Sequence, residues 1–256
     1  MFIKALLIGI WAGIAGVDMF DGLTHIHRPI VTGPIVGLIL GDVQTGLIVG
    51  ATLELVWMGM VPLAGAQPPN VVIGGIIGTS IAILGHLDPQ AAVGVAVPFA
   101  VAAQAGITLL FTAFSPVMHK ADEYAENANT RGIDRINYLG LLILFISYFI
   151  CGFLPIYFGA SEAAEIVGLI PENIIGGLSV AGGIMPAIGF AMLLKVMLKK
   201  EYVTFLIGGF LLVTYFNIPI LALALVGLCI ALYDYYLKSD KLEVAVAREE
   251  DYEDGI

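Results

Sequence analysis

Charged residues are scarce in this 256-residue sequence. They make up 12% of the chain, whereas hydrophobic residues make up 59%, and the mean hydropathy is +0.96. An average soluble domain contains about 25% charged residues. A water-soluble fold of this size could not bury so much apolar surface. The composition therefore excludes an ordinary soluble protein and predicts an integral membrane protein with several spans.

Cysteine is rare, and the common catalytic motifs are missing. The two cysteines, Cys151 and Cys229, each lie in an apolar run without a CxxC pattern or a neighbouring histidine. This arrangement predicts neither a disulfide framework nor a structural zinc site. The sequence also lacks the GxxxxGKS/T, HExxH and GxSxG motifs. We therefore expect a chain that is not itself an enzyme, with no catalytic residue, cofactor or metal ion.

Basic residues are sparse as well, and the net charge is −10. Much of the negative charge lies in the last segment, 238–256, whose acidic residues are Asp240, Glu243, Glu249, Glu250, Asp251, Glu253 and Asp254. This segment has little apolar surface to bury, so we expect a solvated, partly disordered tail. No clustered basic residues suggest a nucleic-acid partner.

Charge-free stretches outline the membrane segments. A spanning helix needs about 20 apolar residues, so about seven or eight crossings fit in this length. The first stretch resembles a signal peptide, but the later spans favour a retained helix. The pattern predicts an all-α polytopic bundle. Its apolar stretches are residues 5–17, 30–41, 55–85, 89–118, 136–161, 173–194 and 202–233.

Two of these stretches are interrupted near their middle. Residues 55–85 contain Pro62 and the sequence QPPN at 67–70, and residues 202–233 contain Asn-Ile-Pro at 217–219. Proline removes a backbone donor and breaks a helix. Paired interrupted segments in the two halves of a transporter indicate a binding site near the bilayer midplane. We expect two pseudo-repeated halves with re-entrant hairpins, and two ordinary helices joined by a tight turn are the alternative.

A hydrophilic segment separates the two halves. Residues 119–135 contain Lys120, Arg131 and Arg135, and the positive-inside rule places this amphipathic connector in the cytoplasm. Segments 86–90 and 161–172 contain acidic residues but no Lys or Arg, so we expect them outside. The predicted organisation is a first membrane half at 1–118, the connector at 119–135, a second membrane half at 136–237 and an acidic cytoplasmic tail at 238–256.

Polar side chains inside apolar segments are costly in lipid and are candidates for a binding site. They form three groups in the first third of the chain. The groups are Asp18, Asp21, His25, His27 and Arg28 in GVDMFDGLTHIHRP, Glu54 in GATLELVWMG, and Gln67 and Asn70 in GAQPPN.

These residue types suit a sugar. Carboxylates and amides form hydrogen bonds with sugar hydroxyls, and an aromatic side chain such as Trp57 can cover the ring. A structural role remains the alternative for two of the groups. Glu54 can belong to an ion pair, and Asp18 and Asp21 can simply end a helix near the membrane interface.

The pair His25-x-His27 has several interpretations. A lone HxH is weak evidence for a metal site, and no third ligand follows at a recognisable spacing. Phosphate transfer through a histidine is a second idea, but the sequence shows no setting for a nucleophile. We favour a structural role or hydrogen bonding at the binding site.

The sequence around these residues resembles a known family. HRP at 27–29, LGDxxTG at 40–46, GxTLE at 50–54 and GGLSVAGGIMPAIGFAMLL at 176–194 resemble the IIC subunit of the mannose–fructose–sorbose class of the bacterial phosphoenolpyruvate-dependent sugar phosphotransferase system. HIHRP and AQPPN are most similar to the N-acetylgalactosamine/galactosamine branch. The mannose branch has a different residue before HRP and Asp at the position of Asn70.

The resemblance implies a transport function within a larger complex. It implies that IIC binds the sugar and moves it across the inner membrane, paired with a membrane subunit, IID, as a trimer of IIC–IID pairs. Cytoplasmic IIA and IIB carry the phosphoryl group, and IIB passes it to the sugar. By the same resemblance Glu54, Gln67 and Asn70 contact the sugar, and Asp18 and His25 are further contacts.

Two other classes of function fit the same residues. An ion-coupled secondary sugar transporter without phosphorylation would also need carboxylates in the membrane. A receptor or assembly subunit would bind no ligand. The chemical form of the intracellular sugar distinguishes the first alternative, because only a phosphotransferase system delivers it phosphorylated.

Overall fold

The computed structural model describes residues 1–22, 24–60, 68–159 and 171–253. Every regular element in these ranges is helical, which confirms the predicted all-α membrane fold. The chain divides into two compact units, Met1–Val196 and Met197–Ile256. Within the described residues, four helical segments are long and apolar enough to cross a membrane, namely Phe2–Gly22, Pro89–Glu126, Thr130–Gly159 and Val180–Met197.

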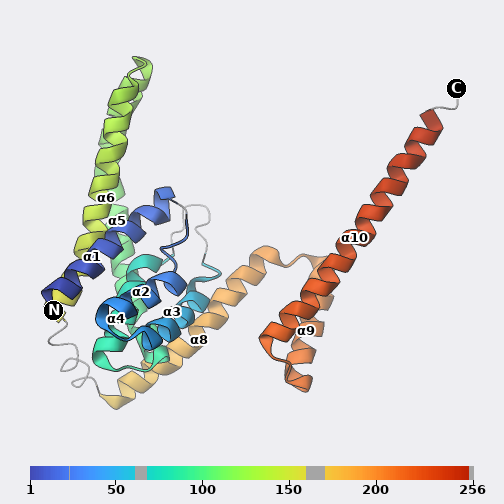
Figure 1. The fold of residues 1–256 in the computed structure, drawn as a ribbon, viewed down its shortest axis with the longest axis horizontal. Coiled ribbons are helices and arrows are strands. Elements are labelled where there is room, and N and C mark those ends of the chain that lie inside the picture. Colours follow the sequence, from blue (N-terminus) through green and yellow to red (C-terminus); the bar gives the residue numbers. More distant parts are fainter. Residues whose placement is uncertain (23, 61–67, 160–170, 254–256) are drawn as a thin grey trace. The chain divides into compact units, whose positions relative to one another are not determined.

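The first unit contains long helices and short ones (Figure 1). Its long helices are α1 (Phe2–Val17, extended by the π-helical turn η1, Asp18–Gly22), α5 (Pro89–Glu126), α6 (Thr130–Gly159) and α8 (Glu172–Met197). Its short helices are α2 (Pro29–Leu40), α3 (Val43–Trp57) and α4 (Val71–Gly85). At 1.5 Å per residue each short helix is about 18–23 Å long, less than the roughly 30 Å of a bilayer core.

Helices α2 and α3 form a tight hairpin. Gly41 ends α2 with φ of 101°, a left-handed conformation that glycine adopts at little cost. Asp42 caps α3 by accepting a hydrogen bond from Thr45 N at 2.9 Å. Gly33 and Gly46 let the two backbones touch, because a Cβ on Gly33 would lie 2.5 Å from Gly46 O. Gly33 and Gly46 therefore serve close helix packing.

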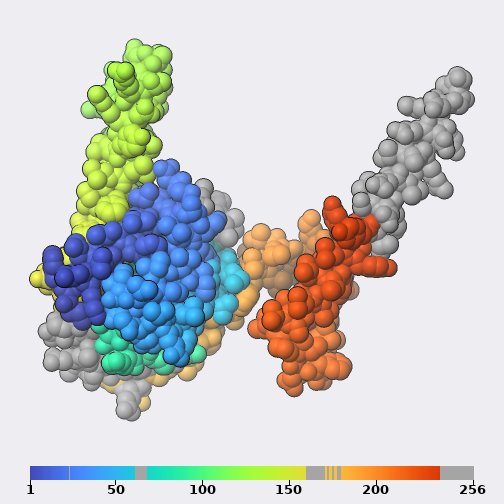
Figure 2. All heavy atoms as spheres, in the orientation of Figure 1, coloured from blue at the N-terminus to red at the C-terminus, as the bar shows by residue number. Residues whose placement is uncertain are grey.

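Helix α4 lies at the centre of the first unit. Twelve of its 15 residues are buried, so it has almost no face left for lipid. It packs against α2, α3, α5 and α6, while α1 packs mainly against α6. Figure 2 shows α1, α2 and α3 packed side by side on one face of this unit. The core is a helix bundle around a short buried helix.

The hydrophilic connector is the joined end of two long helices. Helix α5 continues to Glu126 and α6 begins at Thr130, so residues 119–135 are helical on both sides of a short turn. Tyr124 packs over Gly132 across this turn. The connector therefore extends the α5–α6 pair.

The second unit contains the other predicted interruption. Helix α9 (Val203–Phe216) ends at Asn217, whose φ is 50°, and α10 (Ile220–Glu253) begins after Pro219. The apolar part of α10, Ile220–Tyr236, and α9 are both shorter than 20 residues. This helix–turn–helix with two short apolar arms fits both the expected re-entrant hairpin and the alternative of two helices joined by a tight turn. The backbone of α10 is helical to Glu253, so the described part of the acidic tail continues this helix.

Candidate functional site

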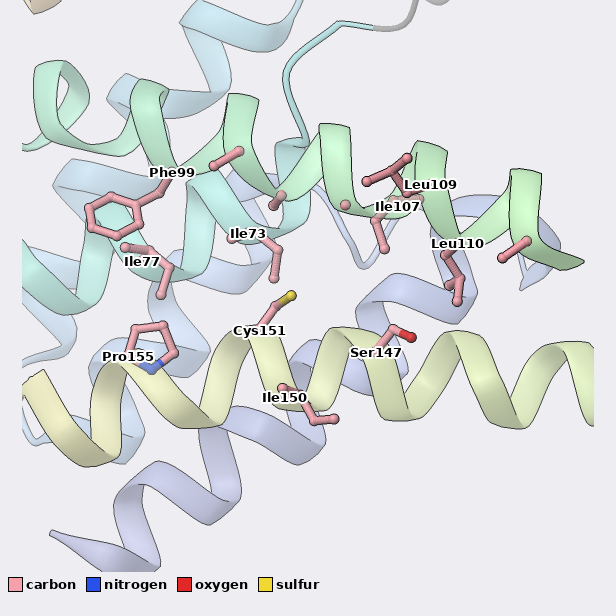
Figure 3. Close-up of a pocket in the computed structure, with 14 residues that line it drawn as sticks. Ile73, Ile77, Phe99, Ile107, Leu109, Leu110, Ser147, Ile150, Cys151 and Pro155 are labelled. Atoms are coloured by element: carbon pink, nitrogen blue, oxygen red, sulfur yellow. The ribbon is translucent and has the colours of Figure 1, made fainter.

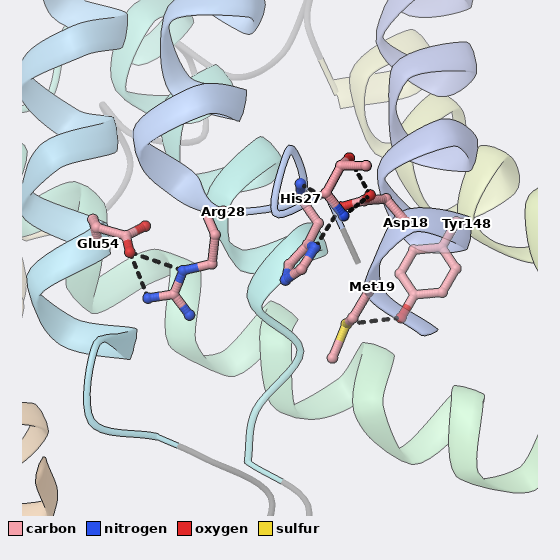
Figure 4. Close-up of polar contacts among 7 residues, drawn as sticks. Asp18, Met19, His27, Arg28, Glu54 and Tyr148 are labelled. Carbon is pink, nitrogen blue, oxygen red and sulfur yellow. Dashed lines mark hydrogen bonds and ion pairs between the residues drawn. The ribbon is translucent and has the colours of Figure 1, made fainter. Parts of the chain in front are cut away.

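Four helix ends meet in the first unit and carry most of the polar residues predicted from the sequence. They are the end of α1 with η1, the start of α2, the end of α3 and the start of α4. Hydrogen bonds join these ends to each other, as Figure 4 shows for several of them. Interrupted helices expose backbone groups and dipole ends, which are the features of binding sites in membrane transporters.

Glu54 forms an ion pair with Arg28 across the α2–α3 hairpin (Figure 4). Arg28 Nε donates to Glu54 Oε1 at 2.8 Å, and Arg28 Nη2 donates to the same oxygen. Ile30 N donates to the other oxygen, Oε2, at 3.3 Å. The side chain of Glu54 keeps 17% of its surface exposed and that of Arg28 keeps 24%, so the pair is accessible. The charge-free stretch at 55–85 begins directly after Glu54. The structure places Glu54 inside α3, because a carboxylate paired with Arg28 does not end the helix.

Asp18 is buried at the end of α1 and organises the following loop. Its Oδ1 accepts hydrogen bonds from Thr24 N, at 2.8 Å, and from Thr24 Oγ1. Its Oδ2 accepts from the backbone N of His27, at 3.3 Å, and lies 2.7 Å from His27 Nδ1. The carboxylate is thereby surrounded by donors, which offsets its burial. Asp21, its neighbour in η1, is exposed.

Asn70 is fully buried and links three helices. Its Oδ1 accepts from Ile73 N at 3.0 Å and caps α4. Its Nδ2 donates to Gln104 Oε1 on α5 at 3.2 Å and to the hydroxyl of Tyr148 on α6. Tyr148 also lies 3.9 Å from the sulfur of Met19, so this network reaches η1.

The remaining predicted contacts have different surroundings. Trp57 is 1% exposed, its Nε1 donates to Pro69 O at 3.1 Å, and its ring packs against Gly74. It therefore supports the join between α3 and α4 in this conformation and offers no open face. His25 is exposed in a turn with φ of 63°. Gln67 lies outside the described residues.

Several polar residues of this region were not among the predicted contacts. His27 and Arg28 belong to the polar group noted in the sequence, but only the structure shows which carboxylate each one meets. Gln104 and Tyr148 lie in apolar runs far along the chain, and a polar residue in such a run is the signal that could have identified Gln104. In the described part of the chain, no three His, Cys, Asp or Glu side chains form a group able to hold a metal ion.

An apolar cavity lies between α4, α5 and α6 (Figure 3). Its volume is about 680 Å³, and its lining includes Ile73, Phe99, Leu110 and Ile150. The polar side chain there, Ser147, already donates to Ile143 O at 2.8 Å. A sugar needs several hydrogen-bond partners, which this apolar lining does not supply. The helix-end region is the better candidate site.

Comparisons with known proteins agree on the family of this chain. The family of PTS system sorbose-specific IIC components matches residues 2–233. N-acetylgalactosamine permease IIC component 1 of Escherichia coli (strain K12) is 36% identical over 250 residues, which cover 95% of this chain and 94% of that protein.

Two solved structures are also similar to this chain. One is described as "Structure of membrane protein" and has a TM-score of 0.82 at 30% identity. The other, the mannose transporter ManYZ in complex with microcin E492, was solved by cryo-EM and has a TM-score of 0.56 at 28% identity. Each match covers 92% of this chain and 96% of the other chain. This chain therefore belongs to the family of sorbose-specific IIC components, and it is a multi-pass membrane permease subunit of the mannose–sorbose class of the phosphotransferase system, with a transport role and not a catalytic one.

Proposed function

We propose that this chain binds an amino sugar, N-acetylgalactosamine or galactosamine, and moves it across the bacterial inner membrane for phosphorylation by IIB. The HIHRP and AQPPN motifs and the likeness to an N-acetylgalactosamine permease support this choice of sugar. The observation that carries the proposal is the meeting of four helix ends around the accessible Glu54–Arg28 pair.

The chemistry of this region suits a sugar. From the described residues, Glu54 Oε2 accepts one long hydrogen bond, from Ile30 N at 3.3 Å, so it has capacity left for a hydroxyl donor. Asn70 caps the start of α4 beside the same helix ends, where both ends of its amide are bonded within the protein in this conformation, and Gln67 precedes it in the QPPN sequence. A site formed by helix ends can change its access when the short helices shift relative to the long ones. We infer an alternating-access movement around these breaks.

The proposed partners follow from the family and from a related complex. We infer that the chain pairs with a membrane subunit, IID, and that IIA and IIB deliver the phosphoryl group from the cytoplasm. The mannose transporter in the related structure carries the two-part name ManYZ, which agrees with a paired membrane complex. A trimer of IIC–IID pairs is the assembly that we expect.

The substitution Glu54→Gln tests the site. It keeps the shape of the side chain but removes the charge that faces Arg28. We expect uptake of the amino sugar to fall at least tenfold, which corresponds to about 1.4 kcal/mol, while the variant still co-purifies with IID. Thr52→Val is the matched control, because Thr52 lies on the same helix and its hydroxyl donates only to Ile48 O. Normal uptake by the Glu54→Gln variant would contradict the site assignment.

An ion-coupled transporter is a second candidate, favoured by the buried Asp18 carboxylate beside His27. In that case the sugar enters unphosphorylated and uptake continues without IIA and IIB. The measurement is the chemical form of labelled sugar inside cells that produce the complete complex. Phosphorylated sugar supports the phosphotransferase function, and free sugar supports ion coupling.

A further inference from the structure

His27 is held in one orientation by a buried carboxylate. Its side chain is 9% exposed, and its Nδ1 lies 2.7 Å from Asp18 Oδ2. The same carboxylate accepts from the backbone N of His27 and from both donors of Thr24. Both the position of the loop and the plane of the imidazole are therefore determined by Asp18.

This contact also decides the chemistry of the other ring nitrogen. A carboxylate only accepts hydrogen bonds, so Nδ1 carries the proton and Nε2 of the neutral ring has a free lone pair. No described residue forms a hydrogen bond with Nε2. Figure 4 shows the ring between Asp18 and Arg28, with its second nitrogen turned away from Asp18. A side chain that is nine-tenths buried thus presents one unused polar atom beside the helix ends.

The other histidine of the HxH pair is placed differently. His25 occupies a left-handed turn, where its carbonyl accepts from Arg28 N at 3.2 Å, and its side chain is exposed. The two rings are 5.7 Å apart and tilted by 49°, so they do not stack. The backbone of His25 shapes the turn that leads into α2, while the imidazole of His27 faces inward.

We propose that His27, through Nε2, accepts a hydrogen bond from a hydroxyl of the transported sugar, and that Asp18 is a positioning residue that acts through His27. This inference rests on the proposed function, because it names a further contact in the same sugar site. It reverses the roles expected from the sequence, in which Asp18 and His25 contact the sugar directly. A carboxylate that orients a histidine from behind is a common arrangement where the imidazole must present one defined nitrogen.

Two substitutions of His27 separate a sugar contact from a structural role. His27→Asn places an amide near the position of Nδ1, so it keeps the contact with Asp18 but loses the group at Nε2. His27→Gln places an amide near Nε2. We expect the KM for sugar uptake to rise at least tenfold in His27→Asn and less in His27→Gln, with both variants assembled with IID. His86→Asn is the matched control and should leave the KM unchanged, since His86 is exposed at the end of α4, outside this site, and Asn tolerates its left-handed conformation with φ of 51°.

The opposite outcomes would overturn the proposal. If His27 only holds the loop in place, His27→Asn transports better than His27→Gln. Equal KM values for His27→Asn and wild type would likewise show that Nε2 does not contact the sugar. Loss of the assembled complex in both variants also assigns a structural role. Failure of the proposed function is distinguishable, because the wild-type complex would then accumulate no phosphorylated amino sugar.

A double variant tests the positioning role of Asp18. Asp18→Asn can donate to Nδ1 and so favours the tautomer with the proton on Nε2. We expect this variant to raise the KM with little change in maximal rate in the wild-type background. In the His27→Gln background it should raise the KM less, because the part that acts through the imidazole is gone and only the contacts of Asp18 with Thr24 and the His27 backbone N remain. An equal rise in both backgrounds would show that Asp18 acts independently of His27.

Discussion

Single residues in the first unit show how polar groups are kept in an apolar protein. Asp18 is surrounded by four hydrogen-bond contacts, and Glu54 faces Arg28. Asn70 is fully buried, yet both ends of its amide are used. Because an unpaired polar group in lipid is costly, these partners are part of the reason that the residues can be there at all.

The hydroxyl of Tyr148 allows a test at this scale. In Tyr148→Phe the buried Asn70 loses one acceptor of its amide. We expect a loss of about 1 kcal/mol in the stability of the detergent-solubilised protein, in the range of hydrogen bonds between membrane helices. The measurement is the thermal unfolding midpoint.

Tyr157→Phe is the control for this variant. Tyr157 lies on the same helix, α6, and its side chain is 41% exposed. Its variant should unfold at the wild-type temperature. A Tyr148→Phe variant as stable as the Tyr157→Phe variant would mean that the Asn70 contact contributes nothing.

At the scale of elements, the short helices α2, α3 and α4 depend on close backbone approach. None of the three is long enough to cross the bilayer, and α2 and α3 have glycine where they meet. Their contact brings Arg28 at the start of α2 next to Glu54 near the end of α3. Packing at the glycines therefore sets the geometry of the proposed sugar site.

Gly33→Ala tests this dependence. The new Cβ would lie 2.5 Å from the backbone oxygen of Gly46, and a backbone atom cannot move aside as a flexible side chain can. We expect a loss of about 1–3 kcal/mol, typical of overpacking, together with loss of uptake because the Arg28–Glu54 pair is displaced. Thermal unfolding and uptake are both measured.

Gly106→Ala is the matched control on α5. Nothing lies within 4 Å of a Cβ at that position. Replacing a helical glycine by alanine should leave stability unchanged or raise it by about 0.5–1 kcal/mol. If Gly33→Ala behaved like Gly106→Ala, the α2–α3 contact would not be tight in the membrane.

At the scale of the whole molecule, helix α5 relates the structure to the membrane. Its 38 residues extend over about 57 Å, so it is long enough for its two ends to lie on opposite sides of a roughly 30 Å core. The end near residue 126 carries the basic residues of the connector, and the segment before Pro89 has none. We propose that the connector faces the cytoplasm.

Cysteine labelling tests this orientation. Ala128→Cys in the α5–α6 turn and His86→Cys at the end of α4 are both at exposed positions. In a background without Cys151 and Cys229, a membrane-impermeant maleimide applied to intact spheroplasts should label the residue-86 variant and not the residue-128 variant. Permeabilised cells should give labelling of both. The reverse pattern in spheroplasts would invert the proposed topology.

The sequence by itself determined the class of molecule. Scarce charge and long apolar runs require a helical membrane protein, because lipid leaves the backbone no other partner than itself. Proline and asparagine marked both interruptions, since their local chemistry ends helices without help from the rest of the fold. The family was recognisable from motifs around HRP and GxTLE, and the comparisons confirm it.

Only the tertiary structure decided which polar groups face each other. Glu54 and Arg28 are 26 residues apart, and Asn70 and Tyr148 are 78 apart, so no local pattern could pair them. The charge-free stretch from residue 55 misplaced the start of α3, because a paired carboxylate need not end a helix. His25 and His27 are alike in sequence, yet one is exposed and the other is held by Asp18. Their roles differ because the fold brings a buried carboxylate to only one of them.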